Sequence, residues 1–441
     1  MENYEVIVIG SGPAGNTAAY ALKEQGKKVA IVESDLWGGT CPNRGCDPKK
    51  MLMSGVEAQK RIETMIGKGF EQTPKIVWED LMTFKRSYTD SVPQNTKEGL
   101  DSAEITRYQG QASFIDAHKI IVDDQTLTAD QFLIATGQRP AVLPIDGQEL
   151  LQSSTDFLEL EHLPKRIAFL GAGYIAFELA IIASAAGSDV HIIHHNDRPL
   201  KGFDQELVSD LVEHMKADGI TFHFNVDTKA VELMHPNYRV TGEDFEVITD
   251  MVIGATGRIP NVEGLNLENA GVEYDKRGIK VDDHLRTTQQ TIFACGDVVA
   301  RFQPKLTPVA GFEAGYVVGA MSDEQKVIEY PLIPTIVFGD QRLARVGLSE
   351  KELADHPEKY HSQTTDLSSW YTYHRINDQG AKIKIVYDEE ENIVAISCLS
   401  QLADEVINYL LVILTKKMTH EEVEKYIFAY PSPASDLSYF I

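Results

Sequence analysis

One local pattern occurs twice in this chain and constrains its fold more than any other feature. An apolar segment runs into a glycine-rich turn, small and apolar residues follow at helical spacing, and a second apolar segment comes next. The small residues of the two turns are Gly10, Gly12 and Gly15 in the first copy and Gly171, Gly173 and Ala176 in the second. The pattern predicts a strand, a tight turn, a helix and a parallel strand in each copy. Two copies in 441 residues predict an α/β fold with two similar domains.

The first turn has the spacing that a phosphate-binding backbone requires. Gly10 permits the tight turn, Gly12 allows the backbone to approach a pyrophosphate, and Gly15 lets the helix pack closely on the strand. The helix N-terminus adds free N–H groups and the positive end of the helix dipole. Glu33 ends the next apolar segment, where a carboxylate can accept hydrogen bonds from ribose hydroxyls. We interpret this copy as a Rossmann-like dinucleotide site; the alternative is a glycine-rich packing turn.

The second copy has no carboxylate at the ribose position. Its second strand is followed by His195, and Arg198 and Lys201 come shortly after. A carboxylate there would bind the 2′-hydroxyl of NAD and repel a 2′-phosphate, so these neutral and basic groups favour NADP, with NAD less favoured. The set His191, His194 and His195 also admits a metal site, but strand alternation points His191 away from His194 and disfavours it.

The remaining segments show weaker patterns. We expect a long polar helix over roughly residues 74–100 and hairpin-like strands over 103–134. After about residue 328, short strands alternate with turns, and two helices are predicted near 402–416 and 420–427.

Composition excludes several classes of protein. The net charge of -25 argues against nucleic acid or an anionic membrane as a partner. No apolar run approaches the ~20 residues of a membrane-spanning helix. The first strand begins near the N-terminus and no signal peptide fits, so we expect a cytoplasmic protein. Four cysteines do not make a disulfide framework.

Two of those cysteines form a close pair, Cys41 and Cys46. Their four-residue gap differs from the usual zinc spacing, and no second Cys/His pair accompanies them. The pair can close a small disulfide ring at the start of a helix, where the dipole stabilises a thiolate. Asp47 is expected to raise the pKa of Cys46 and Arg44 to lower it. Two buried structural cysteines are the alternative.

The cysteine segment, Gly-Gly-Thr-Cys-x4-Cys-x-Pro-x-Lys, resembles that of the flavoprotein disulfide reductases. Further segments of the chain resemble motifs of that family in the same order: 134–137, 254–261, 293–297, 306–310 and 333–338. The resemblance implies an FAD-binding domain (1–148 and 258–327), an NAD(P)-binding domain (149–257) and a C-terminal α+β dimerisation domain (328–441). It therefore implies a homodimer that acts on a small-molecule oxidant.

The resemblance also implies roles for individual residues. FAD would be bound by Gly10, Gly12, Gly15, Glu33, Gly39, Thr40, Thr136, Gly137, Gly296, Asp297 and Thr307. NADP would be bound by Gly171, Gly173, Tyr174, Ile175, His195, Arg198, Lys201 and Gly257. The catalytic residues would be Cys46 against the flavin, Cys41 facing the substrate, Lys50 near the flavin with Glu178 as its ion-pair partner, and Tyr430. No resident metal is implied, and Cys295 and Cys398 are interpreted as core residues.

The chain departs from the family pattern in ways that leave the acceptor open. Tyr430 stands where the family has a histidine base, and Ser435 stands where it has that histidine's glutamate partner. The arginines that bind glutathione would fall at Tyr20 and Gly315. The leading interpretation is reduction of a small disulfide. Reduction of a metal ion, a quinone or another oxidant remains an alternative, as does a non-enzymatic redox-sensing flavoprotein.

Overall fold

The computed structural model describes residues 2–322 and 327–441. Residue contacts divide the chain into two compact units. Unit 1 comprises Met1–Lys49, Thr83–Ala141 and Gly257–Glu329, and unit 2 comprises Lys50–Met82, Val142–Thr256 and Tyr330–Ile441. The predicted NAD(P)-binding and dimerisation segments fall in unit 2 except for residues 257 and 328–329, and the three-domain division stays a prediction. No helix in the described part of the chain is both long and apolar enough to cross a bilayer.

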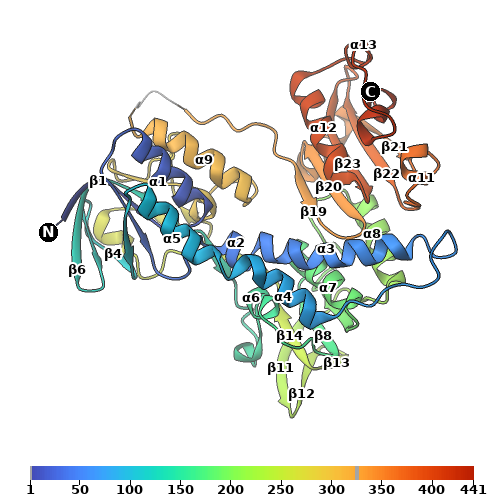
Figure 1. The fold of residues 1–441 in the computed structure, drawn as a ribbon, viewed down its shortest axis with the longest axis horizontal. Helices are drawn as coiled ribbons and strands as arrows, with labels where there is room; N and C mark the ends of the chain where they lie inside the picture. The colour runs from blue at the N-terminus through green and yellow to red at the C-terminus, as the bar shows by residue number, and fades with distance from the viewer. Residues whose placement is uncertain (1, 323–326) are drawn as a thin grey trace. The chain divides into compact units, whose positions relative to one another are not determined.

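Unit 1 is built on a mixed sheet whose central strand is β1. The strand order is β3-β2-β1-β6-β5-β4, with β18 pairing β6. The strands are β1 (Glu2–Ile9), β2 (Val29–Glu33), β3 (Thr106–Gln109), β4 (Ala112–Asp116), β5 (Lys119–Val122), β6 (Gln125–Ile134) and β18 (Ile292–Ala294). Helices α1 (Pro13–Glu24) and α9 (Thr307–Ala320) lie side by side in this unit (Figure 1). The two faces of β1 enter different cores, with Val6 and Val8 against α1 and α9 and Ile7 and Ile9 on the opposite side.

Short elements complete unit 1. They are α2 (Thr40–Arg44), α5 (Val92–Ser102), β7 (Gln138–Pro140), β15 (Arg258–Pro260), β16 (Tyr274–Asp275), β17 (Gly278–Ile279), and the 3-10 turns η2 (Leu267–Ala270) and η3 (Gly296–Val298). Two longer helices, α3 (Cys46–Glu63) and α4 (Trp78–Thr89), each begin in one unit and end in the other.

The single long helix predicted over 74–100 is wrong. The segment forms two helices, α4 and α5, separated by Asp90 and Ser91. Pro93 lies in the first turn of α5, where its missing N–H costs nothing, but it cannot continue a helix that arrives from upstream. A break just before the proline is the result.

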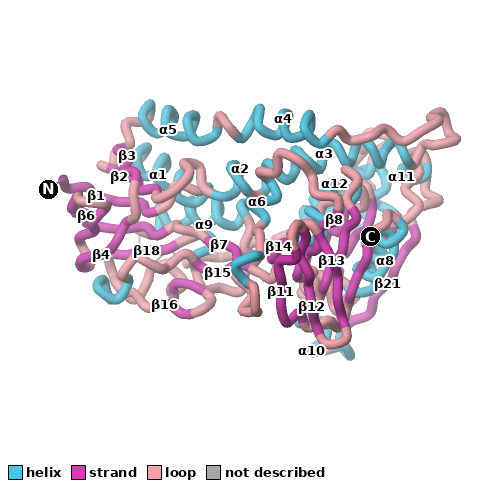
Figure 2. Tube along the Cα trace, turned by 90° about the horizontal axis from the view of Figure 1, so that it is seen from below, coloured by secondary structure: helices cyan, strands magenta, loops and turns pink. Residues whose placement is uncertain are grey.

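Unit 2 contains a second parallel sheet, in the order β10-β9-β8-β14. Its strands are β8 (Arg166–Leu170), β9 (Asp189–Ile193), β10 (Thr221–His223) and β14 (Met251–Gly254). Its helices are α6 (Ser154–Leu158), α7 (Tyr174–Ala185) and α8 (Gln205–Ala217), and η1 (Gln148–Leu150) precedes them. Figure 2 shows β11 (Thr228–Met234), β12 (Asn237–Gly242) and β13 (Phe245–Thr249) as neighbouring strands, and they pair antiparallel.

The C-terminal part of unit 2 is a five-stranded antiparallel sheet, in the order β19-β20-β23-β22-β21. Its strands are β19 (Thr335–Val337), β20 (Arg342–Gly347), β21 (Tyr360–Asp366), β22 (Lys382–Asp388) and β23 (Ile393–Ser400). The associated helices are α10 (Glu350–Asp355), η4 (Pro357–Lys359), α11 (Tyr371–His374), α12 (Ala403–Lys416), α13 (His420–Val423) and η5 (Pro433–Tyr439). Helix α13 is shorter than the predicted 420–427, because Tyr426 and Ile427 are exposed and supply no apolar face for another turn.

The two glycine turns have the same geometry, as the repeated pattern predicts. Gly10 has φ 105° and Gly171 has φ 109°. A Cβ on either glycine would lie 2.4 Å from a carbonyl oxygen, that of Ala135 for Gly10 and that of Ala255 for Gly171. The chain therefore tolerates only glycine at the first position of both turns.

This geometry gives a stability prediction. Gly10→Ala places a methyl group against the Ala135 carbonyl at a positive φ, so we expect a loss of about 2 kcal/mol or more of unfolding free energy. Gly315→Ala is the matched control, because Gly315 lies within α9 with open space at its Cβ and should gain about 0.5–1 kcal/mol. Denaturant unfolding measures both. Equal stability of the two variants contradicts the steric argument.

Candidate active site

Two glycines shape the loop that carries the cysteines. Gly38 and Gly39 have φ of 97° and 71°, in the left-handed region that glycine tolerates. A Cβ on Gly39 would lie 2.5 Å from the Cα of Gly12, so the loop approaches the first glycine turn this closely only because Gly39 has no side chain. The buried Asn43 side chain donates to the carbonyls of Trp37 and Gly39 at 3.0 and 2.8 Å. These two hydrogen bonds tie the cysteine loop internally.

The two cysteines lie where two helices begin. Cys41 is in α2, Cys46 is the first residue of α3, and both are free thiols. Sγ of Cys46 is 3.8 Å from Oγ1 of Thr307, the first residue of α9, so the positive ends of α3 and α9 favour negative charge on Cys46. The pKa of Cys41 lies above that of an ordinary thiol, first because of its hydrogen bond with Cys46 and then because of burial.

The charged neighbours of the pair differ from the expectation. The Cys41 thiol donates a hydrogen bond to Asp47, with Sγ 3.8 Å from Oδ1, so this carboxylate acts on Cys41 and not only on the adjacent Cys46. Helical side chains lean toward the N-terminus of their helix, which turns Asp47 back toward α2. Arg44 forms an ion pair with Asp35, so its charge is matched away from the thiols.

The residues of unit 1 fit the FAD that the sequence predicts. Glu33 is buried at the end of β2, and its Oε2 accepts from the N–H and the hydroxyl of Ser11 at 2.9 and 2.7 Å. Oδ1 of Asp297 is buried without a hydrogen-bond partner among the described residues, and burial raises the pKa of this carboxyl. A buried oxygen without a partner suits a ligand hydroxyl. The surroundings of these two carboxylates are compatible with the predicted roles of both residues in binding FAD, which stay predictions.

Two turns complete the predicted FAD cradle. Oγ1 of Thr136 donates to the Asn261 carbonyl at 2.7 Å, and Gly137, with φ 66°, accepts from the Asn261 N–H. At the other turn, the Gly296 N–H donates to Oε2 of Glu313 at 2.7 Å.

Glu313 is fully buried in α9 and also pairs with the buried Arg301. Sequence analysis did not identify this pair, which holds the loop of Gly296 and Asp297 at the start of η3. The sequence signal for this pair was Glu313 itself, an acidic residue in an otherwise apolar helical segment.

The predicted pair of Lys50 and Glu178 is present in unit 2. Nζ of Lys50 contacts Oε2 of Glu178, which is almost fully buried in α7. The other carboxylate oxygen accepts from the Phe338 N–H at 3.1 Å, and the Lys50 ammonium lies 3.8 Å from the centre of the Phe338 ring. A buried carboxylate with several partners fixes the direction of the lysine side chain.

The second glycine turn opens onto an exposed basic loop. Gly173 is the N-cap of α7, Tyr174 is 40% exposed and Ile175 follows it in the first turn. Beyond β9, His195 bonds to the side chain of Asn196, whose other amide atom accepts from the backbone N–H of Arg198. The side chains of His195, Arg198 and Lys201 are exposed around this loop. The loop therefore presents donors and cations, whereas Glu33 occupies the equivalent place in unit 1.

The C-terminal segment holds the predicted site residue Tyr430. Its ring is 72% exposed and stacks on Tyr371, with centroids 6.1 Å apart. Oγ of Ser435 donates to the Ser432 carbonyl at 2.7 Å and takes part in capping η5. Ser435 therefore does not orient Tyr430 as the family's glutamate orients its histidine.

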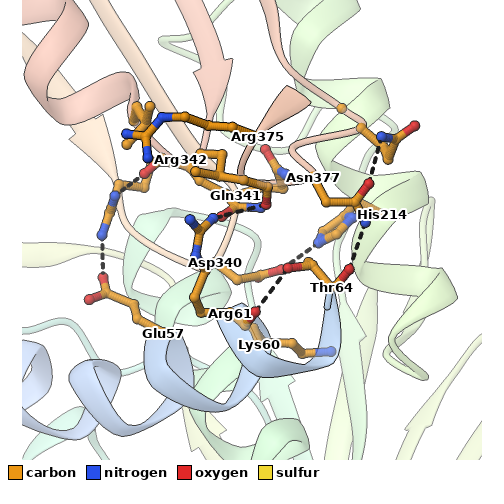
Figure 3. A pocket seen from close by; sticks show the side chains of 15 residues that line it. Glu57, Lys60, Arg61, Thr64, His214, Asp340, Gln341, Arg342, Arg375 and Asn377 are labelled. Atoms are coloured by element: carbon orange, nitrogen blue, oxygen red, sulfur yellow. Dashed lines mark hydrogen bonds and ion pairs between the residues drawn. The ribbon is translucent and has the colours of Figure 1, made fainter. Parts of the chain in front are cut away.

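Unit 2 also has a cavity lined by charged side chains (Figure 3). Nε2 of His214 is 2.7 Å from Oδ2 of Asp340. Burial lowers the pKa of His214, but the hydrogen bond and charge of Asp340, together with the charge of Asp218, raise it above the ordinary value. Lys60 bonds to Asp218 at 2.7 Å. The ligand-type atoms of His214, Asp218 and Asp340 lie within 4.8 Å of one another. Since a lysine and a histidine already neutralise these carboxylates, we interpret the cluster as a structural ion-pair network.

The remaining cysteines are packed in cores. Cys295 and Cys398 are both fully buried, and burial raises the pKa of each thiol. The prediction that both cysteines are core residues is confirmed.

Comparisons with known proteins agree with this arrangement. Residues 4–314 match the family described as pyridine nucleotide-disulphide oxidoreductase, and residues 333–438 match its dimerisation domain. The chain is 32% identical over 441 residues to a glutathione reductase from Burkholderia cepacia, covering 98% of this chain and 97% of the relative. It is 33% identical over 362 residues to a mercuric reductase from Staphylococcus aureus, covering 79% and 65%.

A solved structure resembles the whole chain. The copper(II) complex of the HOCl-induced flavoprotein disulfide reductase RclA from Escherichia coli superposes with a TM-score of 0.90, at 25% identity and with 100% of both chains covered. The matches span both units and include the dimerisation domain. The chain therefore belongs to the pyridine nucleotide-disulphide oxidoreductases, FAD-dependent enzymes that use NAD(P)H.

Proposed function

We propose that this enzyme is an NADPH-dependent reductase that passes electrons through Cys46 and Cys41 to a small disulfide of low negative charge. The observation that carries the proposal is the placement of the two thiols, with Cys46 at the start of α3 beside Thr307 and Cys41 in α2 beside a carboxylate. The sulfurs thus differ in their surroundings, which suits different roles. The bound flavin would supply hydride acceptance from the nicotinamide and electron delivery to the disulfide.

The proposed chemistry at the cysteines balances as two thiol–disulfide exchanges. The thiolate of Cys41 attacks one sulfur of the acceptor disulfide, which forms a mixed disulfide and releases one thiolate. The thiolate of Cys46 then attacks Sγ of Cys41, which closes the Cys41–Cys46 disulfide and releases the second thiolate. The proton that leaves Cys41 and one proton from solvent convert the two released thiolates into thiols. The N-terminal ends of α3 and α9 stabilise the Cys46 thiolate until it attacks Cys41.

The preference for NADPH rests on the loop after β9. His195, Arg198 and Lys201 surround the position where the equivalent turn of unit 1 has Glu33. Cations favour a 2′-phosphate, while a carboxylate at this place would repel it. Since neutral histidine contributes only hydrogen bonds near pH 7, we propose that Arg198 and Lys201 supply most of the discrimination.

The acceptor's charge follows from the surroundings of Cys41. Asp47 adds a carboxylate at the thiol, and the chain carries a net charge of -25. The hydroxyl of Tyr20, in α1, lies against Gly99 of α5, where a Cβ would be 2.6 Å from the hydroxyl oxygen. Neither Tyr20 nor Gly315 can form bidentate pairs with carboxylates as arginine does. Glutathione disulfide, with its several carboxylates, is therefore disfavoured as the acceptor.

A thiophilic metal ion is the second candidate acceptor. Tyr430 takes the place of the histidine base, and no histidine follows His420 in the sequence. A tyrosine cannot exchange protons near pH 7 as imidazole does. When the dithiol reduces a metal ion, no product thiol is released, so no general acid is needed to protonate one. The chain is similar to a mercuric reductase and to RclA, whose structure was solved as a copper(II) complex.

We also propose a homodimer in which the C-terminal segment completes the partner's site. The match to the family's dimerisation domain covers residues 333–438 and includes Tyr430. The exposed ring of Tyr430, stacked on Tyr371, is then available to a second copy.

The cofactor proposal gives a direct prediction. Lys201→Glu should reduce kcat/KM for NADPH by about 10-fold or more and leave kcat/KM for NADH within about twofold, since only NADPH has a 2′-phosphate to repel. Lys216→Glu, an equal charge change at the end of α8, is the control. Steady-state kinetics with both nucleotides measure the ratio. A parent enzyme that prefers NADH, or an equal loss for both nucleotides, contradicts the proposal.

The acceptor proposal is tested with a panel of oxidants. Neutral and cationic small disulfides should turn over faster than glutathione disulfide at low salt, and higher salt should reduce this difference in turnover rate. Copper(II) and mercury(II) are assayed alongside, and faster metal reduction would favour the second candidate. Cys41→Ser and Cys46→Ser should each remove at least about 10³-fold of the activity. Glutathione disulfide turnover exceeding that of the neutral disulfides would refute the charge argument.

A further inference from the structure

We propose that Asp47, held in place by Tyr88, is a positioning residue that keeps the proton on Cys41. This inference rests on the proposed function, because it assigns Cys41 as the thiol that meets the acceptor. The pair of Asp47 and Tyr88 would determine when Cys41 becomes nucleophilic.

The geometry joins three side chains from three helices. Sγ of Cys41, in α2, donates to Oδ1 of Asp47, the second residue of α3, at 3.8 Å. The hydroxyl of Tyr88, near the end of α4, donates to Oδ2 of the same carboxylate at 2.8 Å. Each carboxylate oxygen therefore has its own donor. The tyrosine fixes the orientation in which the other oxygen faces the thiol.

The groups around Cys41 leave the carboxylate's influence in place. The charged and titratable groups near the thiol are Cys46 and Asp47 on α3, Tyr88 on α4 and Arg44 on its own helix. Arg44 is paired with Asp35, so it does not neutralise Asp47. Thr307 of α9 favours the thiolate of Cys41, whereas the hydrogen bond and charge of Cys46, burial, and the charge of Asp47 all favour the thiol.

The pKa values of the two proton donors, Tyr88 and Cys41, are both raised, so each keeps its proton at neutral pH. The hydrogen bond to Asp47, assisted by burial, raises the pKa of Tyr88 to about 12, so Tyr88 remains a donor throughout the neutral range. The pKa of Cys41 is raised, so this thiol holds its proton at neutral pH and loses it as the pH rises. Cys46, between two helix N-termini, then carries the negative charge of the reduced pair.

The consequence is a division of labour between the sulfurs. Cys46 holds the charge, and Cys41 stays protonated until an acceptor arrives. Removing the charge of Asp47 should free the Cys41 thiolate at lower pH, whereas removing the hydroxyl of Tyr88 leaves the charge but loosens its position.

The test measures the reactivity of Cys41 directly and needs no turnover. In a Cys46→Ser background, Cys41 is alkylated with iodoacetamide across a pH series in the FAD-loaded enzyme, and peptide mapping follows its modification. Adding Asp47→Asn should lower the midpoint by about one pH unit and accelerate alkylation several-fold at pH 7. Adding Tyr88→Phe should shift the midpoint by less. Asp80→Asn, the same change at an exposed position of α4, should leave it unchanged.

The outcomes separate this inference from the proposed function. An unchanged or higher midpoint in Asp47→Asn, with flavin content and circular dichroism like those of the background protein, overturns the role of Asp47. An equal shift in Asp80→Asn overturns it as well, because the effect would then come from net charge. Failure of the oxidant panel would instead overturn the proposed function and leave the alkylation profile as predicted.

Discussion

The close approach of Gly39 to Gly12 is the constraint on which the candidate site depends. A Cβ on Gly39 would lie 2.5 Å from the Cα of Gly12, so the cysteine loop reaches the first glycine turn only with glycine at position 39. Once the loop is there, Asn43 ties it internally and α3 begins at Cys46, next to the first residue of α9. Backbone packing thus places the thiol of Cys46 beside the predicted flavin site.

Opposed electrostatic surroundings then make the two sulfurs different. The N-terminal ends of α3 and α9 favour charge on Cys46, whereas the hydrogen bond with Cys46, burial and the carboxylate of Asp47 disfavour it on Cys41. The same contrast separates the two glycine turns, since Glu33 follows one and basic side chains follow the other. In the proposed function, this duplicated backbone geometry with different charges at equivalent places would give the two nucleotide sites different preferences.

The sequence predicted what depends on local pattern, and missed what depends on side chains meeting across the fold. Both glycine turns, their strands and the pair of Lys50 and Glu178 could be predicted, because small-residue spacing and family motifs carry them. The break between α4 and α5 was signalled by Pro93 but was outweighed by the polar helical pattern. The contact of Asp47 with Cys41, and its support by Tyr88, could not be predicted, because 41 positions separate Tyr88 from Asp47. The buried pair of Arg301 and Glu313 was missed because neither residue lies in a recognised motif.

The central claim is that electrons from the nicotinamide reach Cys41 and Cys46, and peptide mapping after anaerobic reduction tests it most directly. The air-oxidised, FAD-loaded enzyme is alkylated under native conditions before and after addition of NADPH without acceptor. The account predicts that Cys41 and Cys46 are linked as a disulfide before reduction and are both alkylated afterwards, while the fully buried Cys295 and Cys398 stay unmodified in both samples. The claim is contradicted if NADPH bleaches the flavin while the state of Cys41 and Cys46 does not change.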